Sequence, residues 1–481
     1  MIQNIIANIL GRSSSVILSI IFTPLIITKL GFESYGIIAF ANIIIALTSL
    51  IDLGFSISLN RSIAANSENI QKNFFIASLI RNYESFFLIC FGFVIFIGML
   101  FGFLIQEAFL NSNSYSSLYL YLCVLVIFFN SAIRLPINTF TAVYLGLEKH
   151  VFVNIFLFIF AFMRIVIALS VSAYFAEILV FFIIQCLISF FEYLFFKLTT
   201  NKLTNYLINA NRFSLKNFIP EIKNSINIGF ITILALLISQ YDKVLFSSYL
   251  SLNEFGKYGV VIMIASGIIS LGYPVATSLF PRMTKFVDKQ EELFNTFNFG
   301  LSILMLILLP MVSLIFFFSD AILKLYIGND SLGGAYSFYL SALSVFAFFS
   351  GMRPLVSNYF FACNNENELK HYYLYFSFAY IIFLPIALYK TYFFIAIYLM
   401  VIMHSIFFIY LYIRCLLKMR RPIVINFFKL LVPISVVFIF SKYLSLIYID
   451  PNLYELVLIF ILNLSIVFIL YLRTFKTYLY G

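Results

Sequence analysis

The chain has 481 residues, of which 63% are hydrophobic and only 10% are charged, and its formal net charge is +10. An average soluble domain carries about 25% charged residues, whereas this chain combines few charges with a mean hydropathy of +1.04. The composition excludes a soluble globular enzyme, a disordered protein and a nucleic-acid-binding domain. It indicates a protein that crosses a membrane many times.

Hydrophobic runs of about 20 residues, the length that a membrane-spanning helix needs, recur along the whole chain. The first run has polar residues before it and no small-x-small cleavage site after it, so we expect it to be retained as a helix. Fourteen spans are predicted, at 10–28, 36–58, 76–104, 118–145, 151–172, 174–196, 225–249, 256–280, 294–318, 337–361, 369–389, 391–413, 426–447 and 453–472. The expected fold class is therefore an all-α integral membrane protein.

The distribution of Lys and Arg sets the expected orientation. With the N-terminus placed in the cytoplasm, twenty of these residues fall in the inner loops and five in the outer loops. Because positive residues concentrate on the cytoplasmic side of membrane proteins, we expect both termini to be cytoplasmic. The longest loop, 197–224, is basic and expected inside, and no outer loop is long enough for a folded domain.

An internal repeat connects the two halves of the chain. Tyr35 and Tyr258, each followed by Gly, open the second and eighth spans 223 residues apart, and Arg134 and Arg353 lie 219 residues apart in the fourth and tenth spans. These offsets predict two six-helix lobes related by a pseudo-twofold axis along the membrane normal, with chance similarity between hydrophobic helices as the alternative. The expected domains are an N-terminal lobe at 1–200, a cytoplasmic basic linker at 201–224, a C-terminal lobe at 225–418, and a C-terminal pair of extra helices, 13 and 14, at 419–481.

Charged residues inside the predicted spans are the candidate functional residues, because a charge at the bilayer centre costs about 3 kcal/mol. Apart from Arg12, which lies near the inner end of the first span, the set contains five cations and three acids. Surplus arginine favours an anionic ligand that carries phosphate, in a water-filled cavity, because the guanidinium group matches phosphate oxygens and stays charged. The full set is Arg12, Asp52, Arg81, Glu84, Arg134, Arg164, Asp242, Lys243 and Arg353.

Simpler roles are open for several of these residues. Arg81 and Glu84 are three residues apart on one helix, a spacing that predicts a local ion pair. Arg12 could extend its side chain to the cytoplasmic surface. Asp242 and Lys243 point in different directions, and either could pair with another element.

The deepest cations have no such local explanation. Arg134, Arg164 and Arg353 have no acid within one turn on their own helices, so their partners must come from another helix or from a ligand. Glu177 and Glu192 lie near the ends of predicted helices and are expected to be interfacial.

Cysteine and histidine show no pattern of a metal site. The five Cys residues are scattered without a C-x-x-C pair, and the three His residues form no cluster. We therefore expect no metal site, no disulfide framework, no cofactor and no catalytic constellation.

Several short motifs resemble those of bacterial O-antigen and polysaccharide flippases. Their order and spacing, over nearly the whole chain, are similar to the Wzx-type family of the multidrug/oligosaccharidyl-lipid/polysaccharide (MOP) exporter superfamily. The motifs are Ile21-Phe22-Thr23-Pro24-Leu25, Thr28-Lys29-Leu30-Gly31, Tyr35-Gly36, Asp52-Leu53-Gly54 with Arg61, and Ser239-Gln240-Tyr241-Asp242-Lys243 with Glu254 and Tyr258-Gly259.

The resemblance implies a function in surface polysaccharide assembly. It implies two lobes around a cation-rich cavity, alternating access, and a substrate made of an oligosaccharide repeat unit on undecaprenyl pyrophosphate. The unit would be flipped from the cytoplasmic to the periplasmic leaflet of the bacterial inner membrane for O-antigen or capsule, a transport function and not an enzymatic one. Membrane lipids, the polysaccharide polymerase and the chain-length regulator are the implied partners. Coupling to the membrane potential, H⁺ or Na⁺ stays open.

The resulting hypothesis assigns roles to the charged residues. Arg134 and Arg353 would hold the pyrophosphate with help from Arg164 and Lys243. Asp52 and Asp242 would position these cations or bind a coupling cation. Arg12 and Arg81 are further substrate-binding candidates, and Glu84 is a charge-pairing candidate.

Three alternatives to this function are open. An organic-cation or multidrug exporter and a peptidoglycan-precursor flippase belong to the same superfamily. A membrane polymerase or ligase is disfavoured, because no large outer loop is available to carry catalytic residues.

Overall fold

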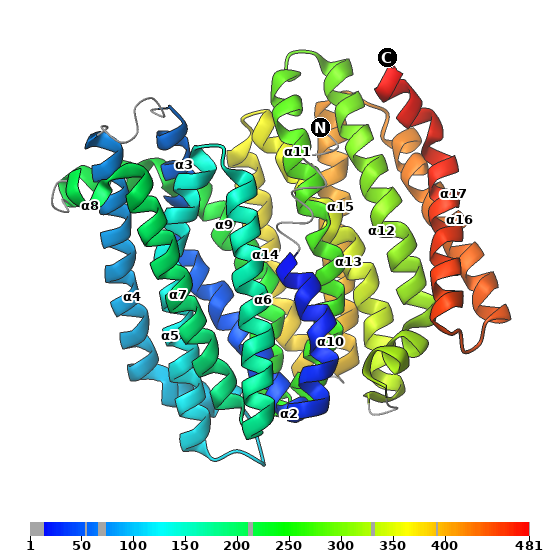
Figure 1. The fold of residues 1–481 in the computed structure, drawn as a ribbon. Coiled ribbons are helices and arrows are strands. Elements are labelled where there is room, and N and C mark those ends of the chain that lie inside the picture. Colours follow the sequence, from blue (N-terminus) through cyan, green and yellow to red (C-terminus); the bar gives the residue numbers. More distant parts are fainter. Residues whose placement is uncertain are drawn as a thin grey trace. The chain divides into compact units, whose positions relative to one another are not determined.

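The computed structural model describes residues 14–52, 55–65, 74–209, 215–328, 332–390 and 393–480. All regular elements in these ranges are helices, and no strand occurs there (Figure 1). The helices are α2 (Ser14–Thr48), the 3₁₀ helix η1 (Ser49–Asp52), α3 (Phe55–Ala65), α4 (Phe74–Phe109), α5 (Ser117–Gly146), α6 (His150–Phe175), α7 (Ile178–Thr204), α8 (Tyr206–Asn209), α9 (Leu215–Tyr249), α10 (Leu252–Ser270), α11 (Gly272–Lys285), α12 (Gln290–Ile327), α13 (Gly333–Ala362), α14 (Glu366–Lys390), α15 (Phe393–Lys418), α16 (Ile423–Ile447) and α17 (Leu453–Tyr480).

Thirteen segments of the described chain are long and apolar enough to cross a membrane. The first, Val16–Asp52, contains a break at Gly31, whose φ of 82° and ψ of 171° lie outside the helical region. Glycine adopts this conformation without a steric penalty, so the segment holds two helices where two spans were predicted. The remaining twelve segments correspond to the other predicted spans, which confirms the prediction of an all-α integral membrane protein.

The second predicted span, 36–58, is interrupted in the structure. Helix α2 ends at Thr48, η1 follows, and α3 begins at Phe55. Asp52 Oδ1 accepts hydrogen bonds from the backbone N–H and the hydroxyl of Ser56, each at 2.9 Å. An acidic side chain that accepts from the first backbone N–H groups of a helix stabilises its start, which explains why a new helix begins after the break.

Packing divides the chain into two compact units. One unit is Leu25–Gly259, and the other combines Met1–Pro24 with Val260–Gly481. The chain passes from one unit to the other inside α2 and again inside α10. The predicted lobe boundaries and the pseudo-twofold axis stay predictions.

The repeated Tyr-Gly motif marks a close helix contact in the unit Leu25–Gly259. A Cβ atom added at Gly36 would overlap the carbonyl oxygen of Leu252, and one added at Gly256 would overlap that of Phe32. At Gly259 an added Cβ would lie 2.9 Å from Cβ of Ala39. Small residues allow membrane helices to approach backbone to backbone, so these glycines let the second half of α2 pack directly on the start of α10.

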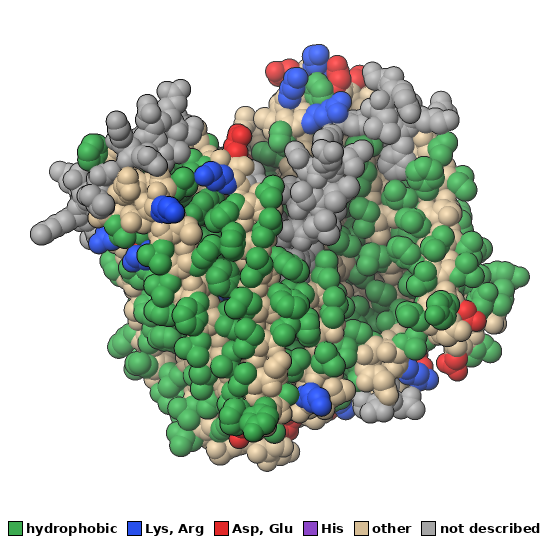
Figure 2. Space-filling view, viewed as in Figure 1, with side chains coloured by type: hydrophobic (Ala, Val, Ile, Leu, Met, Phe, Trp, Pro, Cys, Tyr) green, Lys and Arg blue, Asp and Glu red, His purple; other side chains and the backbone are tan. Residues whose placement is uncertain are grey.

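The same unit presents an apolar exterior along α4 to α7. Figure 2 shows hydrophobic side chains over the length of these helices, with Lys and Arg gathered mainly toward one end. Inside, α5 packs against both α4 and α7. This distribution is typical of helices in contact with lipid acyl chains.

In the other unit, the last two helices are fixed to α12. The side chain of Asn463 in α17 is fully buried, accepts from Ser441 Oγ of α16 at 3.2 Å, and donates to Ser313 Oγ of α12 at 3.2 Å. Phe318, Leu444, Leu456 and Ile459 form an apolar cluster from the same three helices. One amide thus ties the predicted extra helices to the rest of their unit.

Candidate functional site

The structure separates the intramembrane arginines into paired and unpaired groups. Arg81 and Arg164 each lie within ion-pair distance of a carboxylate. In the part of the chain that the structure describes, Arg134 and Arg353 have none. The unpaired arginines are the two that the internal repeat had singled out.

Arg134 projects from the middle of α5 and is half-buried. It forms no hydrogen bond or ion pair with any described residue. The charges of Arg164 and Glu192 both act on its guanidinium group. Because these two charges oppose each other, the ion pair does not replace a carboxylate partner for Arg134.

Arg164 of α6 forms an ion pair with Glu192 of α7. The Arg164 side chain is 11% exposed and that of Glu192 is 2% exposed. The expectation that Glu192 lies near the end of its helix is wrong, because α7 continues to Thr204 and places Glu192 well inside the helix. Glu177 is exposed at the start of α7, as expected, and accepts a hydrogen bond from the hydroxyl of Tyr119.

Arg353 of α13 has defined partners, but they are neutral. Its NH1 group lies 3.3 Å from Nδ1 of His404 in α15. Its guanidinium carbon lies 5.9 Å from the ring centroid of Phe407. These contacts orient the guanidinium group without neutralising its charge.

Asp242 and Lys243 of α9 form hydrogen bonds with different partners. Asp242 is 3% exposed and accepts a hydrogen bond from the hydroxyl of Tyr258 at 3.0 Å, which connects it to the second Tyr-Gly motif. Lys243 donates to the backbone oxygen of Ser239 at 2.8 Å and lies 3.4 Å from Gln240 Oε1. The two neighbours are not within ion-pair distance of each other, and the ammonium group of Lys243 has no carboxylate partner among the described residues.

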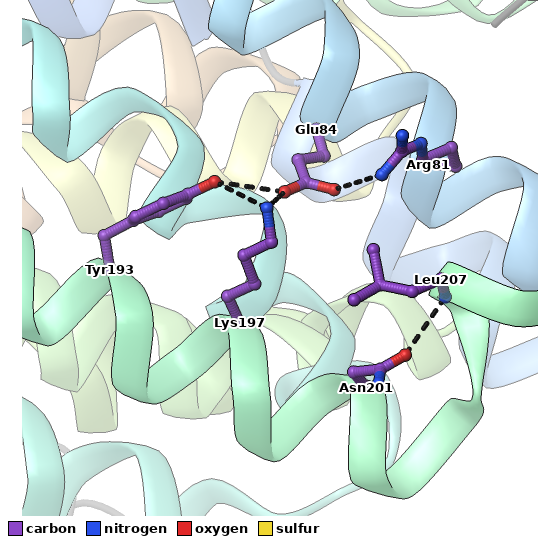
Figure 3. A network of polar contacts seen from close by, with 6 residues as sticks. All are labelled: Arg81, Glu84, Tyr193, Lys197, Asn201 and Leu207. Carbon is purple, nitrogen blue, oxygen red and sulfur yellow. Dashed lines mark hydrogen bonds and ion pairs between the residues drawn. The ribbon is translucent and has the colours of Figure 1, made fainter.

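Arg81 and Glu84 form the predicted local ion pair, and further residues extend it (Figure 3). Glu84 is only 1% exposed and pairs with Lys197 of α7 at 2.8 Å, a shorter contact than the 3.6 Å to Arg81. The hydroxyl of Tyr193 lies 3.1 Å from both Glu84 Oε1 and Lys197 Nζ. In the same view, the side chain of Asn201 accepts from the backbone N–H of Leu207 at 3.0 Å and so supports the start of α8. This network connects α4 to α7. Its structural role is sufficient to explain these charged residues without a ligand.

Two other predicted site residues, Asp52 and Arg12, stand apart from these contacts. Asp52 caps α3 through Ser56, and Arg12 lies outside the described residues. Within the described ranges, no group of three or more His, Cys, Asp or Glu side chains could hold a metal ion.

Two cavities of the separate units contain none of the predicted site residues. One of about 340 Å³ in Leu25–Gly259 is lined mainly by apolar side chains of α2, α4 and α5. One of about 1040 Å³ in the other unit lies between α12 and α16 and includes Arg282 and Lys429. The candidate site therefore rests on charge pairing and not on either cavity.

Sequence reasoning missed two partners that define the site. His404 lies 51 residues after Arg353, and Glu192 lies 28 residues after Arg164. A single His or Glu in an apolar helix carries no periodic signal of its partner. The 219-residue offset matches His404 to Gln185 and not to a histidine, so the repeat gives no signal for this partner either.

Comparison with protein families decides the family. The family described as polysaccharide biosynthesis protein matches residues 1–287, more than half of the chain. The chain belongs to this family. No curated protein matches the sequence closely enough to serve as a relative.

Solved structures similar to this polysaccharide biosynthesis family member are transporters of the MOP superfamily. The lipid II flippase MurJ in an inward closed conformation has a TM-score of 0.71 and 16% identity, with 99% of each chain covered. An inward-facing multidrug resistance MATE family transporter has a TM-score of 0.67 and 13% identity, covering 86% of this chain and 94% of its own. A MOP superfamily transporter from Pyrococcus furiosus has a TM-score of 0.55 and 13% identity, covering 87% of this chain and 95% of its own. The chain thus has the fold of the MOP superfamily and is a multi-pass membrane protein.

Proposed function

We propose that the protein is a flippase for undecaprenyl-pyrophosphate-linked oligosaccharide repeat units of O-antigen or capsule. It moves them from the cytoplasmic to the periplasmic leaflet of the bacterial inner membrane. The observation that carries the proposal is that Arg134 and Arg353, at matched places in the repeat, lack a carboxylate partner among the described residues. An arginine in a membrane span without a counter-ion requires an anion or water beside it.

The chemistry of arginine favours a phosphate group as this anion. The guanidinium fork donates two parallel hydrogen bonds to phosphate oxygens and stays charged at low dielectric. Membership of a polysaccharide biosynthesis family supports an anion that is joined to a saccharide. A lipid diphosphate that carries an oligosaccharide combines both properties.

The extent of the structural similarity also supports a lipid-linked substrate. The lipid II flippase covers 99% of this chain, whereas the multidrug transporter covers 86%. The difference is similar in length to segment 419–481, which carries the last two helices. The similarity therefore favours a flippase over a multidrug exporter.

In this proposal, Arg134 and Arg353 bind the pyrophosphate. Arg164, held by Glu192, contributes to the field around Arg134, and Lys243 supplies a further cation. Both termini lie in the cytoplasm, as the excess of Lys and Arg in the inner loops suggests. The polymerase and the chain-length regulator are the expected protein partners.

The membrane potential is the proposed driving force. Outward movement of negative charge across an inside-negative membrane is favoured by about 2.3 kcal/mol per charge per 100 mV. Collapse of the potential with valinomycin and K⁺, at constant H⁺ and Na⁺ gradients, should stop translocation. Continued translocation would favour antiport of a cation instead.

The deciding experiment uses a null mutant of the source bacterium complemented with variants. Surface polysaccharide and the leaflet distribution of undecaprenyl-linked repeat units are measured for Arg134→Ala and Arg353→Ala. We expect repeat units to accumulate on the cytoplasmic leaflet. Arg414→Ala is the control, because it removes an arginine that is paired with Glu368 at 2.7 Å.

Three results would contradict the proposal. Repeat units that reach the periplasmic leaflet in the null mutant would exclude the flippase function. Export that is restored fully by both Ala variants would exclude their role. Arrest of peptidoglycan synthesis in the null mutant, with normal repeat-unit export, would favour a peptidoglycan-precursor flippase.

A further inference from the structure

His404 is a buried histidine at the centre of a set of aromatic rings. Its side chain is 2% exposed, and its ring centroid lies 4.7 Å from that of Phe346 in α13. The rings of Phe376 and Tyr380, both from α14, lie 5.2 Å away, and all three rings meet the imidazole edge to face. Packing from two helices therefore fixes the orientation of the imidazole.

The hydrogen bonds of His404 determine which ring nitrogen carries the proton. Nδ1 lies 3.3 Å from Arg353 NH1 and 3.4 Å from Ser350 Oγ. A guanidinium group can only donate hydrogen bonds, so Nδ1 must accept, and the imidazole is neutral with its proton on Nε2. Nε2 is buried and has no hydrogen-bond partner among the described residues.

The charges around His404 agree with a neutral imidazole. Arg353 of α13 is the charged side chain in contact with it, and the phenol of Tyr380 is the other titratable group that faces it. No carboxylate is hydrogen-bonded to His404 in the described part of the chain. A protonated imidazole would place a second positive charge against Arg353 and would lose the Nδ1 acceptor.

Arg353 is thus held between two groups that carry no charge. His404 accepts from its NH1 group, and the guanidinium carbon lies over the ring of Phe407 at 5.9 Å from its centroid. Phe407 is itself stacked on Phe376, with ring centroids 4.2 Å apart and planes inclined by 12°. The guanidinium group is fixed in position while its charge and its remaining N–H donors stay available.

The first half of the repeat lacks this arrangement. Gln185 stands at the place that corresponds to His404, but its Oε1 atom is the acceptor for Asn130 Nδ2 at 3.4 Å. Arg134 makes no hydrogen bond with Gln185. Of the two arginines, only Arg353 therefore has a hydrogen bond to an imidazole among the described residues.

We propose that His404 is a positioning residue that holds Arg353 in the orientation that binds the diphosphate group of the substrate. The proposal rests on the proposed function, in which Arg353 contacts this anion. Neutral His404 keeps one N–H group of Arg353 occupied and directs the others toward the ligand.

The test measures binding of undecaprenyl diphosphate to the purified full-length protein in nanodiscs. Leu at position 404 fills most of the volume of the imidazole but cannot accept a hydrogen bond. We expect His404→Leu to weaken binding about tenfold at neutral pH, the loss expected for one hydrogen bond to a charged group. His404→Asn, whose amide oxygen can lie where Nδ1 lies, should recover most of the affinity although it fills less space.

A double-mutant comparison separates positioning from stability. In an Arg353→Met background, His404→Leu should cause no further loss of binding. The ratio of wild-type affinity to His404→Leu affinity should stay constant between neutral and mildly acidic pH, because burial and the neighbouring charge of Arg353 keep the wild-type imidazole neutral. Protonation of the diphosphate affects both proteins equally and cancels in this ratio.

Different results would overturn the two proposals. If Arg353→Met weakens binding but His404→Leu does not, or if His404→Asn binds as weakly as His404→Leu, the positioning role is wrong and the proposed function stands. A further loss from His404→Leu in the Arg353→Met background would also exclude positioning through Arg353. If neither Arg353→Met nor Arg134→Met changes binding, the proposed function itself is wrong.

Discussion

Arg134 and Arg353 occupy matched places in the sequence but stand in different surroundings. Arg353 is oriented by His404 and Phe407, two neutral groups. Arg134 has no hydrogen-bond partner among the described residues and lies in the combined field of a neighbouring ion pair. The predicted repeat thus aligns two guanidinium groups whose supporting residues differ. In both places the charge stays uncompensated, and only the degree of orientation differs.

The largest effect is expected when the ion pair beside Arg134 is broken. Glu192→Leu leaves Arg164, which is 11% exposed, without its carboxylate. Loss of one partner from a buried pair lowers the free energy of unfolding by about 3–5 kcal/mol. Denaturant unfolding in mixed micelles measures this change, and the double variant Arg164→Met with Glu192→Leu should recover most of the stability. Equal stability of the single and double variants would show that the pair does not compensate a buried charge.

A smaller effect is expected from lysine at each of the two unpaired arginines. Arg353→Lys should weaken binding of undecaprenyl diphosphate by about 2 kcal/mol, or about 30-fold, because an ammonium group cannot serve His404 and a bidentate ligand together. Arg134→Lys should cost about 1 kcal/mol, since that site has no second partner to lose. Calorimetric titration of both variants measures the difference. Equal losses would mean that the support by His404 has no effect on the ligand.

The surroundings of Arg134 can also be made more similar to those of Arg353. Gln185→His places an imidazole at the position that corresponds to His404, and removal of the 3.4 Å contact with Asn130 should cost about 1 kcal/mol of stability or less. The Gln185→His change is tested in an Arg353→Met background, so that Arg134 is the remaining arginine of the matched pair. In this background, Gln185→His should make diphosphate binding more sensitive to acidic pH. Gln185→Leu is the control for loss of the amide. An identical pH profile in the two variants would indicate that Arg134 does not reach position 185.

The smallest effect is expected at a paired arginine. Arg81 is 43% exposed and lies 3.6 Å from Glu84, which Lys197 also neutralises at 2.8 Å. Arg81→Ala should therefore change stability by about 0.5 kcal/mol or less and leave diphosphate binding unchanged. Lys197→Met is the variant to compare with Arg81→Ala, because it removes the closer partner of Glu84, whose carboxylate is 1% exposed, and should lower stability more. Loss of binding in a stable Arg81→Ala protein would contradict the division between paired and unpaired arginines.

Much of the fold could be predicted from sequence because the signals are local. A run of about 20 apolar residues is sufficient to predict a span, and glycine at position 31 is compatible with the break between the first two helices. The i,i+3 spacing of Arg81 and Glu84 predicted their contact correctly. Each of these predictions depends on residues within a few helical turns of each other.

The partners of the deep charges could not be predicted in this way. The hydrophobicity that ends near residue 196 predicts a helix end close to Glu192, yet α7 continues to Thr204 through polar residues. The contact of Asp52 with Ser56 could not be predicted either, because it depends on the break between α2 and α3. Contacts between helices depend on which faces meet, and the apolar composition of both faces conceals this information.

The close contact between α2 and α10 has a consequence for detecting distant relatives. At Gly36 and Gly256 the backbone of one helix occupies the space that any side chain would need. Any residue other than glycine at either position would push the two helices apart, whereas an apolar side chain elsewhere on the helices can be exchanged for another of similar size. Searches that weight these two positions, together with the spacing between them, should therefore recover members that overall similarity scores miss.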